Sequence, residues 1–256
     1  MIIAQISDTH IETGTSREAC RLEDLARTVA VINALRPRPV AVVHTGDVSH
    51  DATAEDYQAA LAILGRLEMP LYAILGNRDR RGPFRQAFAG AGYLDPSSRF
   101  VQYAVDLGPL RLVAADTLHE ESGLGAFCPA RAGELEALLA AGAGRPTLVI
   151  AHHPPVEVPS LQGRNPLQFH DPDDAAALVA CIARAPGVVG VAAGHIHRTE
   201  HVAIAHTTLT TMTSVAVDLR RGRDKDLYPR GPVLHLHTFD GTRLQMRPLA
   251  MSAAAA

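Results

Sequence analysis

MIIAQISDTH, residues 1–10, shows the arrangement that recurs through the chain. A short apolar run that suits a buried strand ends at Ile6, and two side chains of metal-ligand type, Asp8 and His10, follow it. Further runs rich in Val and Ile lie at 40–44, 70–75, 111–115, 147–151 and 187–193. We expect each run to form a strand.

Helical patterns lie between several of these runs. Apolar residues in 21–35 recur at helix-like spacing, and 53–67 opens with Thr53 and Asp56 in a capping-box arrangement. Two further helices are predicted at 129–141 and 173–184. Strand and helix alternate through the first third of the chain, which favours βαβ units and a largely parallel sheet buried on both faces.

The last third of the chain has a different pattern. Short Thr- and Val-rich alternating runs fill 199–248, and Asp240-Gly241 reads as a turn, so hairpins are expected there. The mixture predicts an α/β fold, a four-layer αββα sandwich of two mixed sheets flanked by helices. We expect one domain over 1–250, with 199–250 its mainly β part, and a disordered tail at 251–256.

Composition narrows the classes of partner. The chain has 256 residues, 47% of them apolar, and a net charge of -3 without a long basic run, which argues against long nucleic acid and anionic membranes. Arg220, Arg221 and Arg223 lie among acidic residues and read as a solvated turn. No stretch is long enough for a membrane span and no signal peptide is evident, so a cytoplasmic protein is expected. Homo-oligomerisation stays open.

Three cysteines, Cys20, Cys128 and Cys181, lie at wide spacings that fit neither a disulfide framework nor a CxxC zinc site. We expect free, buried thiols. No histidine lies near them in the sequence, so a cysteine nucleophile is disfavoured.

Seven potential metal ligands follow the predicted strands. Because ligand sites gather at the carboxyl ends of strands in open α/β sheets, five chain segments would bring these side chains to one edge. Carboxylate, imidazole and amide donors favour Mn, Fe, Zn or Co over Ca or Mg. Seven ligands exceed the need of one ion, whereas two ions sharing a carboxylate would use them all. The seven are Asp8, His10, Asp47, Asn77, His152, His195 and His197.

Local sequence suggests how these side chains converge. Alternation at a strand end would point Asp8 and His10 the same way, and likewise His195 and His197. A glycine precedes three of the ligands and would allow a sharp turn before each one; these are Gly46, Gly76 and Gly194.

Together these blocks resemble the five-block signature of the calcineurin-like metallophosphoesterases. The resemblance spans 8–197 and rests on Asp8-Thr9-His10, Gly46-Asp47, Gly76-Asn77-Arg78-Asp79, His152 and Gly194-His195-Ile196-His197. It implies that Asp8, His10, Asp47 and His197 hold one ion and that Asp47, Asn77, His152 and His195 hold the other, with Asp47 bridging.

The resemblance also implies an activity. Compact size and the Gly194-to-Arg198 stretch resemble the bacterial class III cyclic-nucleotide phosphodiesterases, a branch that includes glycerophosphodiesterases. A hydroxide between two ions, with Mn and Fe favoured, would attack a small phosphodiester. Asp47, Asn77, Arg78 and His195 are the expected catalytic residues. A phosphomonoesterase and a non-catalytic scaffold with this fold are the alternatives.

Position 78 departs from the family pattern, in which many relatives carry His. Arginine is a poor proton donor near neutral pH but can fork onto phosphoryl oxygens. Arg78 therefore either stabilises phosphoryl charge, in which case alkoxide leaving groups should react poorly, or turns outward to an acid such as Asp79.

Structural interpretations compete with these roles. A single Asp such as Asp8 or Asp47 often caps a helix, and His195 and His197 could be surface residues on either side of a buried Ile196. His153 suits either structural support or substrate contact, whereas His44 reads as a core histidine. Nearby arginines could attract phosphate but more often are solvated residues at a helix start; they are Arg80, Arg81 and Arg85.

Overall fold

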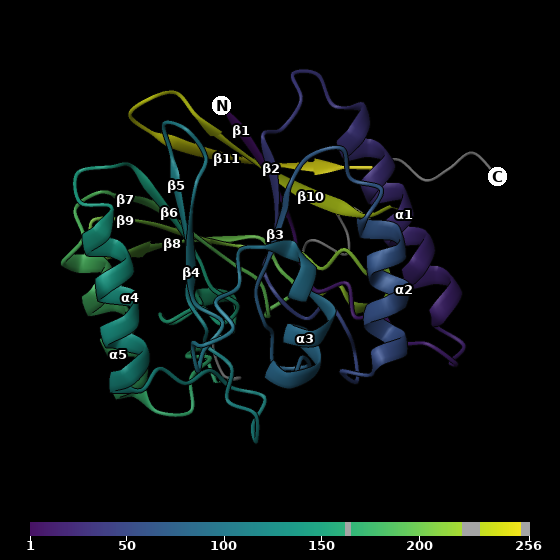
Figure 1. Cartoon of the computed structure of the whole chain (residues 1–256), viewed down its shortest axis with the longest axis horizontal. Helices are drawn as coiled ribbons and strands as arrows, with labels where there is room; N and C mark the ends of the chain where they lie inside the picture. Colours follow the sequence, from purple (N-terminus) through teal and green to yellow (C-terminus); the bar gives the residue numbers. More distant parts are fainter. Residues whose placement is uncertain (162–164, 222–230, 252–256) are drawn as a thin grey trace.

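The computed structural model describes residues 1–161, 165–221 and 231–251. It contains two mixed sheets with helices on both outer sides, as predicted (Figure 1). The first sheet has the order β11-β10-β1-β2-β3, and the second has the order β4-β5-β6-β7-β9-β8. None of the helices in the described ranges is long and apolar enough to cross a membrane.

The first sheet joins the two ends of the chain. Strands β1, β2 and β3 run parallel, whereas β10 pairs antiparallel with both β1 and β11. Their bounds are β1 Ile2–Ile6, β2 Ala41–His44, β3 Leu71–Ala73, β10 Val233–Phe239 and β11 Leu244–Ala250.

The second sheet has a parallel centre and antiparallel edges. Strands β5, β6, β7 and β9 are parallel, and β4 and β8 pair antiparallel at the two margins. The bounds are β4 Tyr103–Asp106, β5 Arg111–Ala114, β6 Thr147–Ile150, β7 Val188–Ala193, β8 Glu200–Ile204 and β9 Thr207–Thr211.

Helices α1 and α2 flank the first sheet, and α4 and α5 flank the second (Figure 1). Thr53 caps α2 by accepting from the Asp56 amide, as the capping-box pattern predicts. The bounds are α1 Glu18–Ala34, α2 Ala54–Leu64, α3 Arg81–Ala87, α4 Pro129–Ala141 and α5 Pro172–Ala183, with 3-10 turns at Ala89–Ala91, Pro159–Leu161 and Val217–Leu219.

Strand β6 shows how the layers bury both faces of a sheet. Leu148 and Ile150 belong to the core cluster that also contains first-sheet residues, whereas Val149 packs in a second cluster with residues of α4 and α5. Gln5 on β1 links the sheets, because its Nε2 donates to Thr45 Oγ1 at 3.0 Å and to Ala193 O at 3.1 Å. The strand ends after β1, β2 and β7 are therefore held together.

Several predictions need correction. Of the cysteines only Cys181 is buried, whereas Cys20 is exposed and Cys128 intermediate. Arg220 is also buried rather than solvated, and Arg223 lies outside the described residues. Met251, which we assigned to the tail, is buried and donates its amide to Pro232 O. The rest of that tail, 252–256, also lies outside the described residues.

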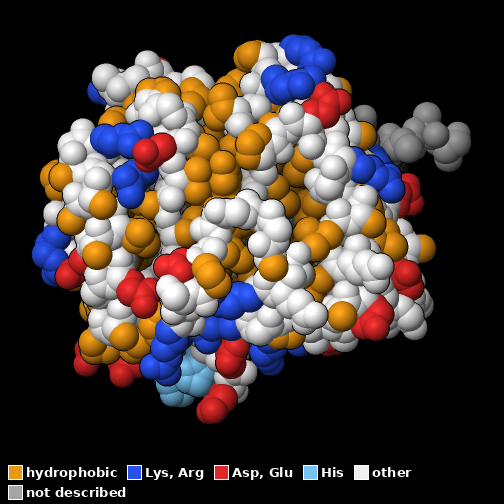
Figure 2. Space-filling view, in the orientation of Figure 1, with side chains coloured by type: hydrophobic (Ala, Val, Ile, Leu, Met, Phe, Trp, Pro, Cys, Tyr) orange, Lys and Arg blue, Asp and Glu red, His pale blue; other side chains and the backbone are white. Residues whose placement is uncertain are grey.

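Charged side chains of both signs lie on the face shown in Figure 2. Figure 2 shows basic and acidic groups interspersed over the visible face, with no continuous basic stripe across it.

Candidate metal centre

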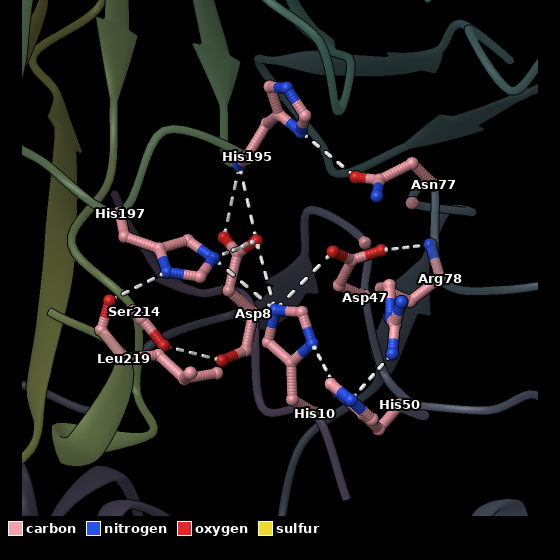
Figure 3. Close-up of polar contacts among 12 residues, drawn as sticks. Asp8, His10, Asp47, His50, Asn77, Arg78, His195, His197, Ser214 and Leu219 are labelled. Atoms are coloured by element: carbon pink, nitrogen blue, oxygen red, sulfur yellow. Dashed lines mark hydrogen bonds and ion pairs between the residues drawn. The ribbon is translucent and has the colours of Figure 1, made fainter. Parts of the chain in front are cut away.

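All seven predicted ligands lie together at the carboxyl ends of five strands. Asp8 and His10 follow β1, Asp47 follows β2 and Asn77 follows β3, all in the first sheet. The second sheet contributes the three others after β6 and β7. Figure 3 shows six of the seven converging on a common centre; the seventh, His152, is placed by its contacts with Asn77 and Asp47.

One group of donors surrounds His10. Its Nε2 lies 3.3 Å from His197 Nε2, 3.3 Å from Asp47 Oδ2 and 3.8 Å from Asp8 Oδ1. The Asp8 oxygen is also 3.3 Å from His197 Nε2. Four donors from three chain segments therefore face one another.

A second group shares the Asp47 carboxylate. Asp47 Oδ2 lies 3.6 Å from His152 Nε2, which is 3.1 Å from Asn77 Oδ1. The same amide oxygen lies 2.9 Å from His195 Nδ1. Asp47 Oδ2 thus lies between His10 of the first group and His152 of the second.

These donor spacings fit metal ions. Around an ion with bonds of about 2.1 Å, neighbouring ligand atoms lie roughly 3.0 to 3.5 Å apart. Most of the distances above lie in or close to that range. The two overlapping donor groups can therefore accommodate two cations with small adjustments of side chains.

Oxygen acceptors behind three of the histidines set which ring nitrogen faces the centre. Thr45 O accepts from His152 Nδ1 at 2.8 Å, and Leu219 O accepts from His197 Nδ1 at 2.8 Å, so each Nε2 keeps its lone pair for the centre. His195 is reversed, because its Nε2 donates to Gln168 Oε1 at 2.9 Å and leaves Nδ1 facing Asn77. Metal-binding histidines commonly have such partners.

Burial keeps most of these imidazoles neutral. It lowers the pKa of His10 and of His152, and it holds the pKa of His195 well below its usual value. His197 differs, because burial opposes its charging but Asp8 raises its pKa. Neutral imidazoles have the free lone pair that a metal requires.

The two carboxylates differ. For Asp8, burial favours the neutral form, but His197 and His10 together hold its pKa well below the usual range. Burial raises the pKa of Asp47 to about 7, and Asp8 and Asp79 add to this effect while His10 opposes it. The Asp47 carboxylate is therefore short of nearby positive charge, which bound cations would supply.

The backbone brings the ligands together in a different way from the one predicted. Asp8 and His10 do not continue β1, which ends at Ile6; they have φ of 54° and 45°, in the left-handed region. His195 and His197 lie beyond β7 with φ of 71° and 53°. Strand alternation therefore does not aim these pairs. Non-glycine residues adopt this region at a cost, and such strain is typical of functional sites.

The glycines have two different roles. Gly46 has a φ of 98°, so it makes the predicted turn, and a Cβ there would lie 2.5 Å from His152 Nδ1. Gly76 and Gly194 lack a left-handed φ. A Cβ at Gly76 would overlap the Asp47 carboxylate, and one at Gly194 would overlap Ser7 Oγ. Close approach, rather than turn geometry, requires glycine at these two positions.

Arg78 and Asp79 have different partners. Arg78 Nη2 lies 2.5 Å from His50 Nε2 (Figure 3) and 3.4 Å from Asp51 Oδ1, so its acidic partner is Asp51. The Arg78 backbone amide donates to Asp47 Oδ1 at 2.7 Å. Buried Asp79 accepts from the Gly76 amide, as expected of a residue that orients this loop.

Other predicted residues have structural contacts. His44 is buried, Thr9 Oγ1 lies 3.0 Å from its Nε2, and burial lowers its pKa to about 3. His153 is buried beside His195, with Thr117 Oγ1 2.9 Å from its Nδ1 and no hydrogen-bond partner at Nε2 among the described residues. The three arginines after Arg78 bind protein groups: Arg80 the Asn77 and Asp79 carbonyls, Arg81 the Asp116 carboxylate, and Arg85 the Asp95, Ser98 and Phe100 carbonyls.

Some site residues were not identified from the sequence. His50 lines the pocket over the centre, and its only signal is its position three residues after Asp47. Gln168 and the carbonyl groups that orient the histidines have no signal in a single sequence. The pocket wall also includes Gly123, Leu161, Arg198, Leu219 and Arg221.

Known proteins provide an independent comparison. The sequence model of the family described as calcineurin-like phosphoesterase matches residues 1–199. A glycerophosphodiester phosphodiesterase GpdQ from Enterobacter lignolyticus is 30% identical over 83% of this chain and 76% of its own length. The 3',5'-cyclic adenosine monophosphate phosphodiesterase CpdA from Pseudomonas aeruginosa is 26% identical over 77% of this chain and 70% of its own.

A solved structure also matches nearly the whole fold. A dimetal phosphatase from Danio rerio superposes with a TM-score of 0.70 and covers 97% of this chain and 95% of its own. The two sequences are 14% identical, so this likeness concerns the fold.

Proposed function

The chain belongs to the calcineurin-like phosphoesterase family and is a metal-dependent phosphodiesterase, and we propose that it hydrolyses small phosphodiesters with two bound metal ions. The observation that carries the two-ion proposal is the position of Asp47 Oδ2, 3.3 Å from His10 Nε2 and 3.6 Å from His152 Nε2. A carboxylate between two groups of donors is suited to bridge two cations.

Each donor group would hold one ion. Asp8, His10 and His197 would complete one site with Asp47. The other site would share the Asp47 carboxylate and use three further donors: Asn77, His152 and His195. Imidazole and carboxylate donors favour Mn, Fe, Zn or Co.

Two bound ions would supply an activated water and neutralise phosphoryl charge. The protein's own residues hold the reacting groups in place. The Arg78 amide fixes Asp47 through Oδ1, and Gln168 holds the His195 ring. Three cationic side chains, Arg78, Arg198 and Arg221, line the pocket and would attract an anionic substrate.

Glycerophosphodiesters and cyclic nucleotides are the substrate classes that we propose. The support is that relatives with these two named activities each align with more than three quarters of the chain. The alternatives are a phosphomonoesterase using the same centre and a scaffold without activity. The complete donor set disfavours the scaffold.

Metal analysis tests the two-ion centre. After reconstitution with Mn²⁺, elemental analysis should give about two ions per chain. His10→Ala and His152→Ala should each reduce this number towards one, because each removes a terminal ligand of a different group. One ion in the wild-type protein, with Asn77 and His152 not involved, would contradict the proposal.

A substrate panel tests the ester class. Bis-p-nitrophenyl phosphate, p-nitrophenyl phosphate, glycerophosphodiesters and cyclic nucleotides should be compared in the presence of Mn²⁺. Higher kcat/KM for diesters is expected, and higher kcat/KM for p-nitrophenyl phosphate than for its bis ester would favour the monoesterase.

A further inference from the structure

His10 differs from the other histidines of the centre in what lies behind its ring. Oxygen atoms hold the outer nitrogens of His152, His195 and His197. The outer nitrogen of His10, Nδ1, instead lies 3.4 Å from Nδ1 of His50, another imidazole (Figure 3). An imidazole can donate or accept, so it does not by itself fix the tautomer of His10.

Arg78 determines the tautomer in the arrangement observed. A guanidinium has only donors, so His50 Nε2, 2.5 Å from Arg78 Nη2, must accept and carry no proton. Neutral His50 then has its proton on Nδ1 and donates it to His10 Nδ1. As a result His10 carries its own proton on Nε2, the atom that faces Asp8, Asp47 and His197.

This tautomer of His10 cannot bind a cation through Nε2. When Nε2 binds a metal ion, neutral His10 must carry its proton on Nδ1 and donate it to His50 Nδ1. His50 then has its proton on Nε2, where it meets the N–H groups of Arg78. Two donors cannot hydrogen-bond to each other, so the contact between His50 and Arg78 has to break.

We propose that His10, His50 and Arg78 form a tautomer relay through which metal binding frees the Arg78 guanidinium from His50 within the substrate pocket. The inference rests on the proposed binding of metal by His10. One proton leaves His10 Nε2 and one arrives at His50 Nε2, while the shared proton moves from His50 Nδ1 to His10 Nδ1. The pair has the same number of protons before and after.

Arg78 is weakly held in its present position. Only Nη2 has hydrogen-bond partners, Nε is buried without one among the described residues, and the side chain is 39% exposed. Its carboxylate partner Asp51 is 58% exposed, and such pairs contribute little.

Release would create a phosphate-binding position. Both His50 and Arg78 line the pocket over the centre. With His50 Nε2 protonated, the imidazole and the guanidinium both present donors there, and a phosphoryl oxygen between them could accept from both. The protein would then acquire this anion site only after His10 holds its metal ion.

Nitrogen NMR of the full chain labelled with 15N-histidine tests the relay. Zn²⁺ is the probe because it is diamagnetic, and proton–nitrogen correlations distinguish the two imidazole tautomers. We expect His50 Nε2 to be unprotonated without metal and protonated once zinc shifts the His10 resonances. Zinc binding at His10 without a tautomer change at His50 would overturn the relay but leave the metal centre intact. Failure of zinc to reach His10 would overturn both.

Zinc affinity gives a second measurement that does not depend on activity. In the relay, zinc binding has to break the contact between His50 and Arg78. Arg78→Ala removes this contact beforehand, so it should tighten zinc binding by about fivefold, which corresponds to one ordinary hydrogen bond. Arg221→Ala is the matched control, since it removes a charge from the same pocket without touching His50. If the two variants tighten zinc binding equally, the loss of a positive charge explains both effects and the relay is overturned.

A double variant separates the relay from charge more sharply. In His50→Asp the carboxylate can accept from His10 Nδ1 and from Arg78 at the same time, so the conflict disappears. Adding Arg78→Ala to this background should tighten zinc binding no more than Arg221→Ala does. A retained fivefold effect would show that His50 transmits nothing.

Discussion

Asp47→Asn should stabilise the metal-free protein above neutral pH, although the same change weakens metal binding. Asp47 is buried close to Asp8 and Asp79, and burial raises its pKa to about 7. Asparagine has the same shape, and its carbonyl can still accept from the Arg78 amide. Its NH₂ group can donate to His152, whose Nε2 lies close to Oδ2 and keeps its lone pair.

The pKa of Asp47 sets the magnitude and the sign of this change in stability. A rise from 3.8 to about 7 corresponds to about 4 kcal/mol at 1.36 kcal/mol per pH unit. Between these values the folded protein keeps the proton that the unfolded chain releases, so stability falls as pH rises through this window. Asparagine does not titrate. It still bears the cost of burying a polar group, so the gain at pH 8 should be roughly 2 to 4 kcal/mol.

Urea-induced unfolding in a chelator at pH 5 and pH 8 measures this effect. The free energy of unfolding of Asp47→Asn should exceed that of wild type by more at pH 8 than at pH 5. With saturating Mn²⁺ at pH 8, wild type should be the more stable protein. Asp51→Asn is the control, because an exposed carboxylate should change stability by less than about 1 kcal/mol. If metal-free Asp47→Asn is less stable than wild type at pH 8, the electrostatic reasoning is wrong.

Three further outcomes are expected. Asp47→Ala should reduce turnover and bound metal more than His10→Ala, since a bridging ligand serves both ions; equal losses in kinetics and elemental analysis would count against a bridge. Gly76→Ala should reduce metal content at least tenfold because its Cβ would overlap the Asp47 carboxylate, whereas Gly82→Ala, with open space around it, should retain its metal. Arg78→His should speed hydrolysis of diesters with poor leaving groups relative to bis-p-nitrophenyl phosphate; an unchanged dependence on leaving-group pKa would place residue 78 outside the chemistry.

The layers of the fold could be predicted because apolar periodicity is a local property. The runs at 147–151 and 187–193 became β6 and β7, and the predicted helix 129–141 is α4 with the same bounds. Two short elements, α3 and β4, were not predicted. The residues of α3 are too few to show helical periodicity, and the apolar run of β4 is confined to Tyr103–Val105 between Gln102 and Asp106.

The order of the strands could not be predicted in the same way. The hairpin with its turn at Asp240-Gly241 was expected, but nothing in its own residues indicates that β10 lies beside β1. The other hairpin, β8 and β9, joins the second sheet through β7. Sheet membership depends on packing between distant segments, which a single sequence does not record.

The candidate site was also predictable only in those features that depend on local sequence. Residue types and strand ends were enough to select seven side chains that the structure brings together, although their metal-binding roles stay predictions. The direction of Arg78 was left open, and His50 was not selected, because both depend on where one side chain lies against another. The left-handed backbone of Asp8 and His10 was also missed, since these residue types more often have ordinary φ values.

The pairing of β1 with β10 has a consequence during synthesis of the chain. Ile2 lies opposite Thr238, so β1 waits for a partner that is made more than 200 residues later. At about 5 to 20 residues per second, a ribosome needs roughly 10 to 50 s to supply that partner. Until then β1 has one open edge beside the loop that carries Asp8 and His10, and exposed strand edges promote aggregation. Slow translation of the segment before β10, or premature termination there, should therefore increase the demand of this protein for chaperones.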